Sequence, residues 1–318
     1  MSLRLTSKPF ATLALVLLLG VAVSAHALTI SPARIELVGD PGATISGEFV
    51  VTNEEAGGRT FYTSAQNFEA RGESGTPNFV DSDTGLSSWV SLAPEVSIAE
   101  GEKRTVPFTV TIPSDADAGG HFAAIFLSTA PPGDAQVSIG AKIGVLVLLR
   151  VAGDVTEAGG VSDFGPLDGR VFTSLPVSFT YRFANSGGDR VNPRGDVIIR
   201  NLIGLKKAVI PANPGEGNVL PGSTRRFETP WGAIATEKPA GFFANVGYQW
   251  ENFAVGPYRA KLALAYGISG ETVETAWVFL FPWQLLSVIL LFLLVLVPVF
   301  LAIVRRYNRW VVEKARSA

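Results

Sequence analysis

Apolar and polar side chains alternate along most of the middle of the chain. In residues 103–112, Val106, Phe108, Val110 and Ile112 occupy one face of an extended segment, and threonines fill the other. A period of two with many Val, Thr and Phe residues is typical of antiparallel strands that are buried on one side. Similar runs recur between turns rich in Gly and Pro, and long amphipathic helical patterns are missing. The pattern therefore predicts an all-β ectodomain.

These runs fall into two sets that repeat the same order of features. A strand ends at Asn53 in the first set and at Asn185 in the second, and a glycine turn opens a later strand at residues 101–104 and 222–225. A repeat of this kind, at the strand spacing of a sandwich, predicts two tandem immunoglobulin-like β-sandwiches. The expected bounds are 28–153 for the first sandwich, 154–160 for a linker of small and polar residues, and 161–281 for the second.

The N-terminus carries the signature of export. Arg4 and Lys8 precede an apolar run, which ends at the small-residue site Ala25-His26-Ala27. The order of positive charge, apolar run and small residues is typical of a cleaved secretory signal peptide. A signal peptide is therefore predicted for residues 1–27.

The C-terminus carries the signature of a membrane anchor. No charged residue interrupts the chain from Ala276 to Val304, and a cluster of arginines follows directly. Pro282 suits the first turn of a helix but not its interior, so a transmembrane helix is predicted for residues 282–304, about 34 Å long. Basic residues mark the cytoplasmic end of such a helix. The expected localisation is the cell membrane, single-pass, with the N-terminus outside and the basic tail, residues 305–318, in the cytoplasm.

Composition narrows the classes of function. The net charge is −2, and without its basic leader and tail the exported part has a charge of roughly −8. That balance argues against binding nucleic acid by bulk charge. The chain has no cysteine, which excludes thiol catalysis and cysteine-based metal sites. Once the leader is removed, His121 is the only histidine.

Few residues are candidates for catalysis or metal binding. His121 lies in a polar segment typical of a turn between strands, and residues 81–85 resemble the opening of a calcium loop without its closing Glu. Paired carboxylates on a β scaffold can hydrolyse glycosides, but the candidates lie in turn-like sequence. These carboxylates are Glu54, Glu55, Glu69 and Glu73. We therefore expect no enzyme activity, no cofactor and no catalytic residue; a calcium site near Asp81 and Asp83 stays open as the weaker alternative.

Aromatic side chains are the best candidates for a binding surface. Trp89 alternates with Val90 and Leu92 in a strand pattern, which favours a core position. Residues 230–255 fit no strand pattern, so a long loop or irregular edge is expected there. The candidate partner-binding residues in this segment are Trp231, Phe242, Phe243 and Trp250. The alternative is that these rings only close the sandwich against the adjacent membrane.

Several short motifs of this chain occur in the order of a known family. They are Ile30-Ser31-Pro32-Ala33-Arg34-Ile35-Glu36-Leu37, Pro41-Gly42, Val51-Thr52-Asn53, Tyr62-Thr63-Ser64-Ala65, Asn185-Ser186-Gly187-Gly188, Pro193-Arg194-Gly195, Val219-Leu220-Pro221-Gly222-Ser223 and Pro282-Trp283. On these motifs the chain resembles the bacterial WxL-interacting surface proteins, whose first domain is placed near the pilus-chaperone-like immunoglobulin fold. The resemblance implies that the first domain binds peptidoglycan and that the second contacts partner or host proteins. The motifs are turn and strand signatures, and they identify no site residue.

These observations together predict a membrane-anchored extracytoplasmic binding or scaffold protein. Its expected partner is a cell-wall polymer or another surface protein, besides the membrane itself, and no nucleic acid. The alternative is a membrane-tethered, chaperone-like assembly factor that offers a strand edge to secreted or surface subunits.

Overall fold

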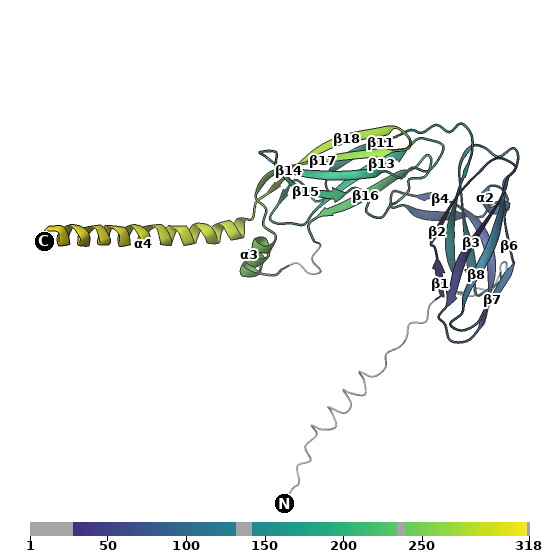
Figure 1. Ribbon diagram of the computed structural model, residues 1–318, viewed down its shortest axis with the longest axis horizontal. Coiled ribbons are helices and arrows are strands. Elements are labelled where there is room, and N and C mark those ends of the chain that lie inside the picture. Colours follow the sequence, from purple (N-terminus) through teal and green to yellow (C-terminus); the bar gives the residue numbers. More distant parts are fainter. Residues whose placement is uncertain (1–27, 132–141, 234–238, 317–318) are drawn as a thin grey trace, which may run out of the picture. The chain divides into compact units, whose positions relative to one another are not determined.

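The computed structural model describes residues 28–131, 142–233 and 239–316 (Figure 1). The signal peptide predicted for residues 1–27 lies outside them. The chain divides into two compact units, one built mainly from residues up to Val151 and the other mainly from residues after it. Each unit is a pair of β-sheets around its own apolar core, and a single long helix ends the chain. The predicted fold class, two immunoglobulin-like sandwiches followed by one apolar helix, is confirmed.

The first unit contains two packed sheets. One sheet has the order β1 (Leu28–Ser31), β3 (Thr44–Asn53), β8 (Lys103–Thr111) and β6 (Val90–Leu92). The other has the order β2 (Arg34–Gly39), β10 (Lys142–Val151), β9 (Gly119–Ser128), β4 (Arg59–Arg71) and β5 (Thr76–Val80), and β7 (Glu95–Ile98) also pairs with β4. The alternation noted in β8 places Val106, Phe108 and Val110 in the core, as the sequence predicts.

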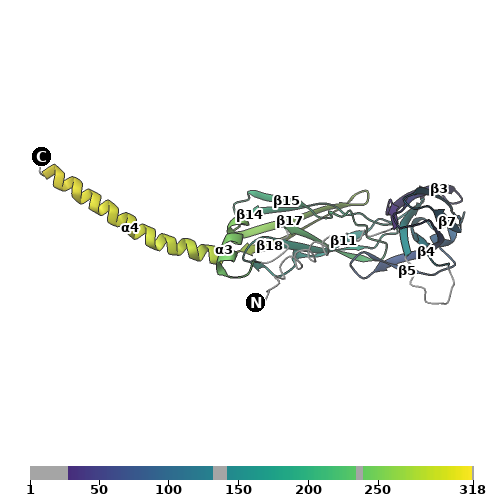
Figure 2. The same ribbon diagram turned by 90° about the horizontal axis from the view of Figure 1, so that it is seen from below.

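The second unit repeats this topology. One sheet has the order β11 (Gly159–Pro166), β13 (Val177–Asn185) and β16 (Thr224–Trp231). The other has the order β12 (Val171–Phe172), β18 (Gly270–Leu280), β17 (Gly256–Tyr266), β14 (Arg194–Asn201) and β15 (Lys206–Pro211), of which β14, β15, β17 and β18 are seen side by side in Figure 2. In both units an early strand pairs in parallel with the last one, β2 with β10 and β12 with β18. The internal repeat inferred from the sequence is therefore a repeat of strand order.

The two asparagines at which the repeat was recognised have the same role. Asn53 is fully buried at the end of β3, where its side-chain amide donates to the Gly57 carbonyl (3.0 Å) and its Oδ1 accepts from the Glu55 N–H (3.1 Å). Asn185 is buried at the end of β13, and its Oδ1 accepts from the Gly187 N–H (2.9 Å). Each side chain thus bonds to backbone groups of a turn that have no partner in the sheet. Asn suits this position because its amide can both donate and accept a hydrogen bond.

The same asparagines fix the glycine turns that open the next strand. The Gly101 N–H donates to the Asn53 carbonyl (2.8 Å), and the Gly222 N–H donates to the Asn185 carbonyl (2.9 Å). Both glycines have a positive φ, +69° and +66°, which residues with a Cβ rarely adopt. The sequence signature of the repeat is therefore a pair of equivalent turns held by a buried amide.

Two segments differ from what the sequence predicts. Residues 86–89 form a short helix, α2 (Leu86–Trp89), so Trp89 precedes the strand β6 instead of alternating within it. The segment expected to be a long loop contains β16 up to Trp231 and then a helix, α3 (Phe242–Glu251). The local residues of α3 are weak helix formers, and its contact with the terminal helix supplies the missing stabilisation.

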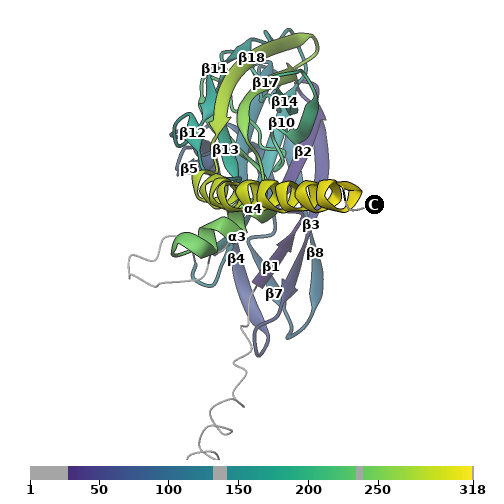
Figure 3. The same cartoon turned by 90° about the vertical axis from the view of Figure 1, so that its left-hand side faces the viewer.

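The terminal helix α4 (Trp283–Arg316) begins directly after Pro282, as predicted, and the Leu286 N–H donates to the Pro282 carbonyl (2.9 Å). It continues past Val304, where the sequence analysis ended it, because no residue of the basic segment breaks a helix. Within the described residues α4 is the one helix long and apolar enough to cross a membrane, and its most apolar part has a mean hydropathy of 3.2 and no residue buried in protein. Figure 3 shows α3 beside its first turns.

Candidate functional site

The four aromatic residues predicted to bind a partner do not form one surface. Trp231, the last residue of β16, is only 7% exposed and packs edge-on against Tyr258, with 5.0 Å between ring centroids. In β16, Phe227, Thr229 and Trp231 alternate inward, and Trp231 lies opposite Val177 of β13. The interpretation of Trp231 as an exposed binding residue is therefore wrong, because strand register turns its ring into the core.

The other three aromatic residues lie on α3 and are exposed. Phe243 is the most open, at 81%, and Phe242 contacts the Trp283 ring at the start of α4, with 5.9 Å between centroids. Trp250 is exposed near the end of the helix. Gln249, the one buried residue of α3, accepts a hydrogen bond from the Leu285 N–H (2.9 Å) and also contacts the Gln284 side chain. The buried amide thus holds α3 against the first turn of α4 and leaves its aromatic side chains outside.

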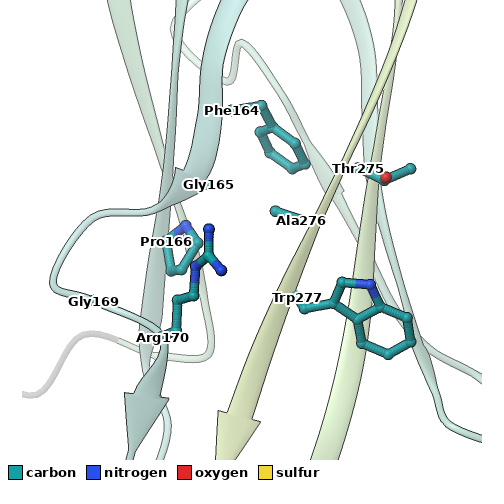
Figure 4. A pocket seen from close by; sticks show the side chains of 8 residues that line it. All are labelled: Phe164, Gly165, Pro166, Gly169, Arg170, Thr275, Ala276 and Trp277. Carbon is teal, nitrogen blue, oxygen red and sulfur yellow. The ribbon is translucent and has the colours of Figure 1, made fainter.

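A groove that the sequence pattern does not predict lies between β11 and β18 (Figure 4). It has a volume of about 340 Å³. The Phe164 ring and the Trp277 indole border it, and the Arg170 guanidinium extends into it from the turn before β12. The available signal was Trp277, a large aromatic at an outward position of an alternating strand. Phe164 and Arg170 come from a distant part of the chain, and no local pattern connects them with Trp277.

The backbone of β18 is unpaired beside this groove, where β11 lies next to it without hydrogen-bonding to it. On its outer side β18 pairs with β12, and within the described chain this pairing covers Phe279 and Leu280 alone. The Phe279 N–H donates to the Arg170 carbonyl (2.8 Å) and the Phe281 N–H to the Phe172 carbonyl (2.7 Å). Backbone groups alternate in direction along a strand, so the N–H and C=O groups of Val273, Thr275 and Trp277 face the open edge. An unpaired strand edge of this kind can accept another strand.

The groove combines three means of recognition. The open edge offers backbone donors and acceptors, Phe164 and Trp277 offer ring surfaces, and Arg170 offers a cation. Within the described part of the chain the Arg170 guanidinium makes no ion pair. This chemistry fits an extended peptide with an acidic or carboxamide side chain, and ring stacking also fits a sugar polymer.

The side chains considered for catalysis pack against other residues or form ion pairs and hydrogen bonds within the protein. His121 lies within β9, not in a turn, and its ring packs on Trp89 with 4.7 Å between centroids. Among the carboxylates, Glu55 pairs with Arg59 (2.9 Å) and Glu69 accepts from the Asn78 amide (3.0 Å). No group of three or more His, Cys, Asp or Glu side chains in the described residues is placed to hold a metal ion.

Three titratable groups are perturbed, and Arg182 is the one at the surface, where its hydrogen bonds to Glu73 (2.7 Å) and Asp163 (2.8 Å) raise the pKa of its guanidinium. The other two, Tyr181 and Arg225, lie in the interior of the second unit. Burial raises the pKa of the Tyr181 phenol above its ordinary value, and the phenol donates to the Ala212 carbonyl (3.2 Å). Burial likewise lowers the pKa of the neighbouring Arg225 guanidinium, which lies over the Phe227 ring at 5.2 Å. A phenol and a guanidinium fixed in this way support packing and present no group to a substrate.

No family model and no curated protein matches this sequence. Among solved structures, the chain is similar to a chain of a chaperone–tip adhesin complex of CFA/I fimbriae, with 13% identity over 79% of this chain and 98% of that chain, at a TM-score of 0.39. It is also similar to the class 5 fimbriae chaperone CfaA, with 12% identity over 79% and 99% at 0.39. A chain of the CsuC–CsuE pre-assembly complex of Acinetobacter baumannii gives 12% over 79% and 98% at 0.36. The fold assignment itself rests on the strand order and pairing described above.

Proposed function

We propose that this protein is a membrane-anchored extracytoplasmic binding protein that holds a cell-wall polymer or another surface protein close to the membrane. The apolar helix α4, whose large apolar side chains are exposed from Ile289 to Leu301, supports the anchor. The arginines that follow Val304 support a cytoplasmic C-terminus, since basic residues are retained on that side. The two sandwiches then lie outside the cytoplasm.

The groove beside β18 is the observation that carries the binding role. A strand edge supplies affinity through backbone hydrogen bonds, and an adjoining pocket supplies specificity through side chains. Here the edge at Thr275 and the pocket at Trp277 and Arg170 are contiguous. The resemblance to the WxL-interacting surface proteins supports the same division of roles, with polymer binding by the first unit and protein contact by the second.

Two variants distinguish a peptide from a polymer at this groove. Trp277→Ala removes the ring, and Thr275→Pro removes only a backbone N–H that faces the open edge, a position at which an edge strand tolerates proline. We expect both variants to weaken binding of an extended peptide by about 5- to 150-fold, the usual effect of about 1–3 kcal/mol at an anchor residue. Binding of purified peptidoglycan by ring stacking should fall with Trp277→Ala and remain unchanged with Thr275→Pro. The full chain in detergent would be tested against a peptide array and in peptidoglycan sedimentation.

Matched controls keep this experiment decisive. Trp250→Ala removes another exposed tryptophan, 69% exposed against 50% for Trp277, that lies outside the groove, and it should leave binding unchanged. Glu274→Pro removes the neighbouring N–H, which faces β17, and should destabilise the fold where Thr275→Pro does not. A loss of binding in Trp250→Ala together with normal binding in Trp277→Ala would place the site on α3 and contradict the groove.

The proposed orientation is testable by thiol labelling, because the chain has no cysteine of its own. Ile268→Cys lies in the turn between β17 and β18, where the native side chain is 87% exposed, and should react with a membrane-impermeant maleimide in spheroplasts. Ser317→Cys should react only after the membrane is permeabilised. The reverse pattern of labelling would overturn the orientation.

A specific feature of the first unit favours the chaperone-like alternative. β2 pairs with β10 from Leu146 to Val151, so among the described residues no strand is hydrogen-bonded to Lys142–Val145 on that side. A secreted subunit could pair with this edge as an added strand. Under this alternative, deleting the gene lowers the amount of a secreted subunit, whereas a binding protein leaves that amount unchanged and alters only where the partner is retained.

A further inference from the structure

Exposed apolar side chains gather at the end of the second unit from which α4 begins. Strand register defines this end: Gly256, the first residue of β17, pairs with Leu280 at the end of β18, and Asn201, the last residue of β14, pairs with Tyr258. The loop between β14 and β15, the segment between α3 and β17, and the exit of β18 therefore lie at the same end. The exposed large apolar residues there are Leu202, Ile203, Leu205, Phe242, Phe243, Trp250, Phe253, Val255, Phe281 and Trp283.

The loop from β14 to β15 is closed by hydrogen bonds at its base and presents apolar side chains outward at its tip. The Asn201 N–H donates to the Leu205 carbonyl (3.0 Å), and Asn201 Oδ1 accepts from the Leu205 N–H (2.9 Å). Arg200 Nη1 donates to the Gly204 carbonyl (2.9 Å). At the tip, Ile203 is 76% exposed beside exposed Leu202. These bonds close the turn, whereas the N–H and C=O groups of Leu202 and Ile203 take part in none of them, so the tip suits the hydrated headgroup layer and not the hydrocarbon core.

Basic residues flank this apolar tip on both sides. Arg200 precedes it, and Lys206 and Lys207 follow it, all with exposed side chains. Long basic side chains at such positions extend to the headgroup level while their stems lie along apolar surface. The combination of an apolar tip with a basic rim is typical of a segment that enters the interface of a bilayer.

Helix α3 provides a second apolar element at the same end. It has no charged residue from Phe242 to Trp250, and it is fixed to the first turn of α4 through Gln249 (Figures 1 and 3). Its exposed aromatic rings are of the kind that concentrates at membrane interfaces. Because α3 is held against the helix that enters the bilayer, the surface nearest to its rings is the headgroup layer.

We propose that the loop at Leu202–Leu205 and helix α3 insert into the headgroup layer of the bilayer that α4 spans, so that the second unit is seated on the membrane at two points besides its anchor. This inference rests on the proposed anchoring by α4. It assigns Phe243 and Trp250 to lipid contact and leaves the groove at Trp277 for the partner.

Three labelled positions and one control test the proposal. Single cysteines at Ile203, Phe243, Ile268 and Val295 would each carry an environment-sensitive fluorophore in the full chain, reconstituted into vesicles of phosphatidylcholine and phosphatidylglycerol. Lipids with a doxyl quencher near the headgroup should quench positions 203 and 243 several-fold more than position 268. Ile268 is the matched control, since it is an exposed apolar residue at the opposite end of β17. A quencher deep in the acyl chain should act on position 295, in the middle of α4.

The outcomes distinguish a failure of the interfacial contact from a failure of α4 to span the membrane. Quenching at 295 together with water-like signals at 203 and 243 would overturn the interfacial contact while α4 still spans the bilayer; the surface would then be open to a protein partner. A water-like signal at 295 would overturn both. Quenching at 243 but not at 203 would limit the contact to α3 and contradict the two-point arrangement. Thermal melting of each labelled protein checks that the fold is intact.

Discussion

Replacing Asn185 by alanine should lower the free energy of unfolding of the second unit by about 3–4 kcal/mol, because three backbone groups each lose a hydrogen bond at once. The Asn185 amide donates to the carbonyls of Asp189 (2.8 Å) and Val219 (2.9 Å), and its Oδ1 accepts from the Gly187 N–H (2.9 Å). The Val219 carbonyl keeps its second bond, from the Val191 N–H (2.9 Å). Melting of the full chain in detergent, followed by circular dichroism, should show a fall of roughly 10–20 °C in the transition of this unit.

Asn53 is the equivalent asparagine of the first unit, so the losses of stability caused by the two alanine variants can be compared. Asn53→Ala should destabilise the first unit by less, about 2–3 kcal/mol, because two of its carbonyl contacts, to Ile98 and Ala99, are longer at 3.3 Å. Asn78→Ala removes an exposed amide and should have almost no effect. Equal melting temperatures for Asn185→Ala and Asn78→Ala would show that the buried amide does not hold the turn.

Trp231→Ala should destabilise the second unit by about 3–5 kcal/mol, the usual cost of removing a large buried aromatic side chain. The ring is enclosed by the core and packs edge-on against Tyr258. Phe243→Ala, which removes an aromatic ring that is 81% exposed, should leave the melting temperature unchanged. The same melting experiment measures both variants.

The two variants distinguish a core residue from a surface residue within residues 230–255. A soluble, normally folded Trp231→Ala variant would contradict the position of this ring in the core. A cooperative loss of structure in Phe243→Ala would mean that α3 is held by its aromatic rings and not by the Gln249 contact with α4.

The sequence by itself determined the features that depend on neighbours along the chain. In β8 the alternation of Val106, Phe108 and Val110 with polar residues predicts which face of the strand is buried, because successive side chains of a strand point to opposite sides. The asparagine turns at 53 and 185 were visible because their hydrogen-bond partners include nearby residues. The apolar helix after Pro282 was visible because length and hydropathy alone describe it.

Only the tertiary structure decided the features that depend on residues far apart. The segment Phe242–Glu251 has little helix propensity of its own, and its helix is held by the contact between Gln249 and the start of α4. Trp231 faces the core because β16 pairs with β13 in a particular register. The groove exists because the pairing of β12 with β18 brings Arg170 beside Trp277, and no local pattern encodes a meeting of two segments so distant in the chain.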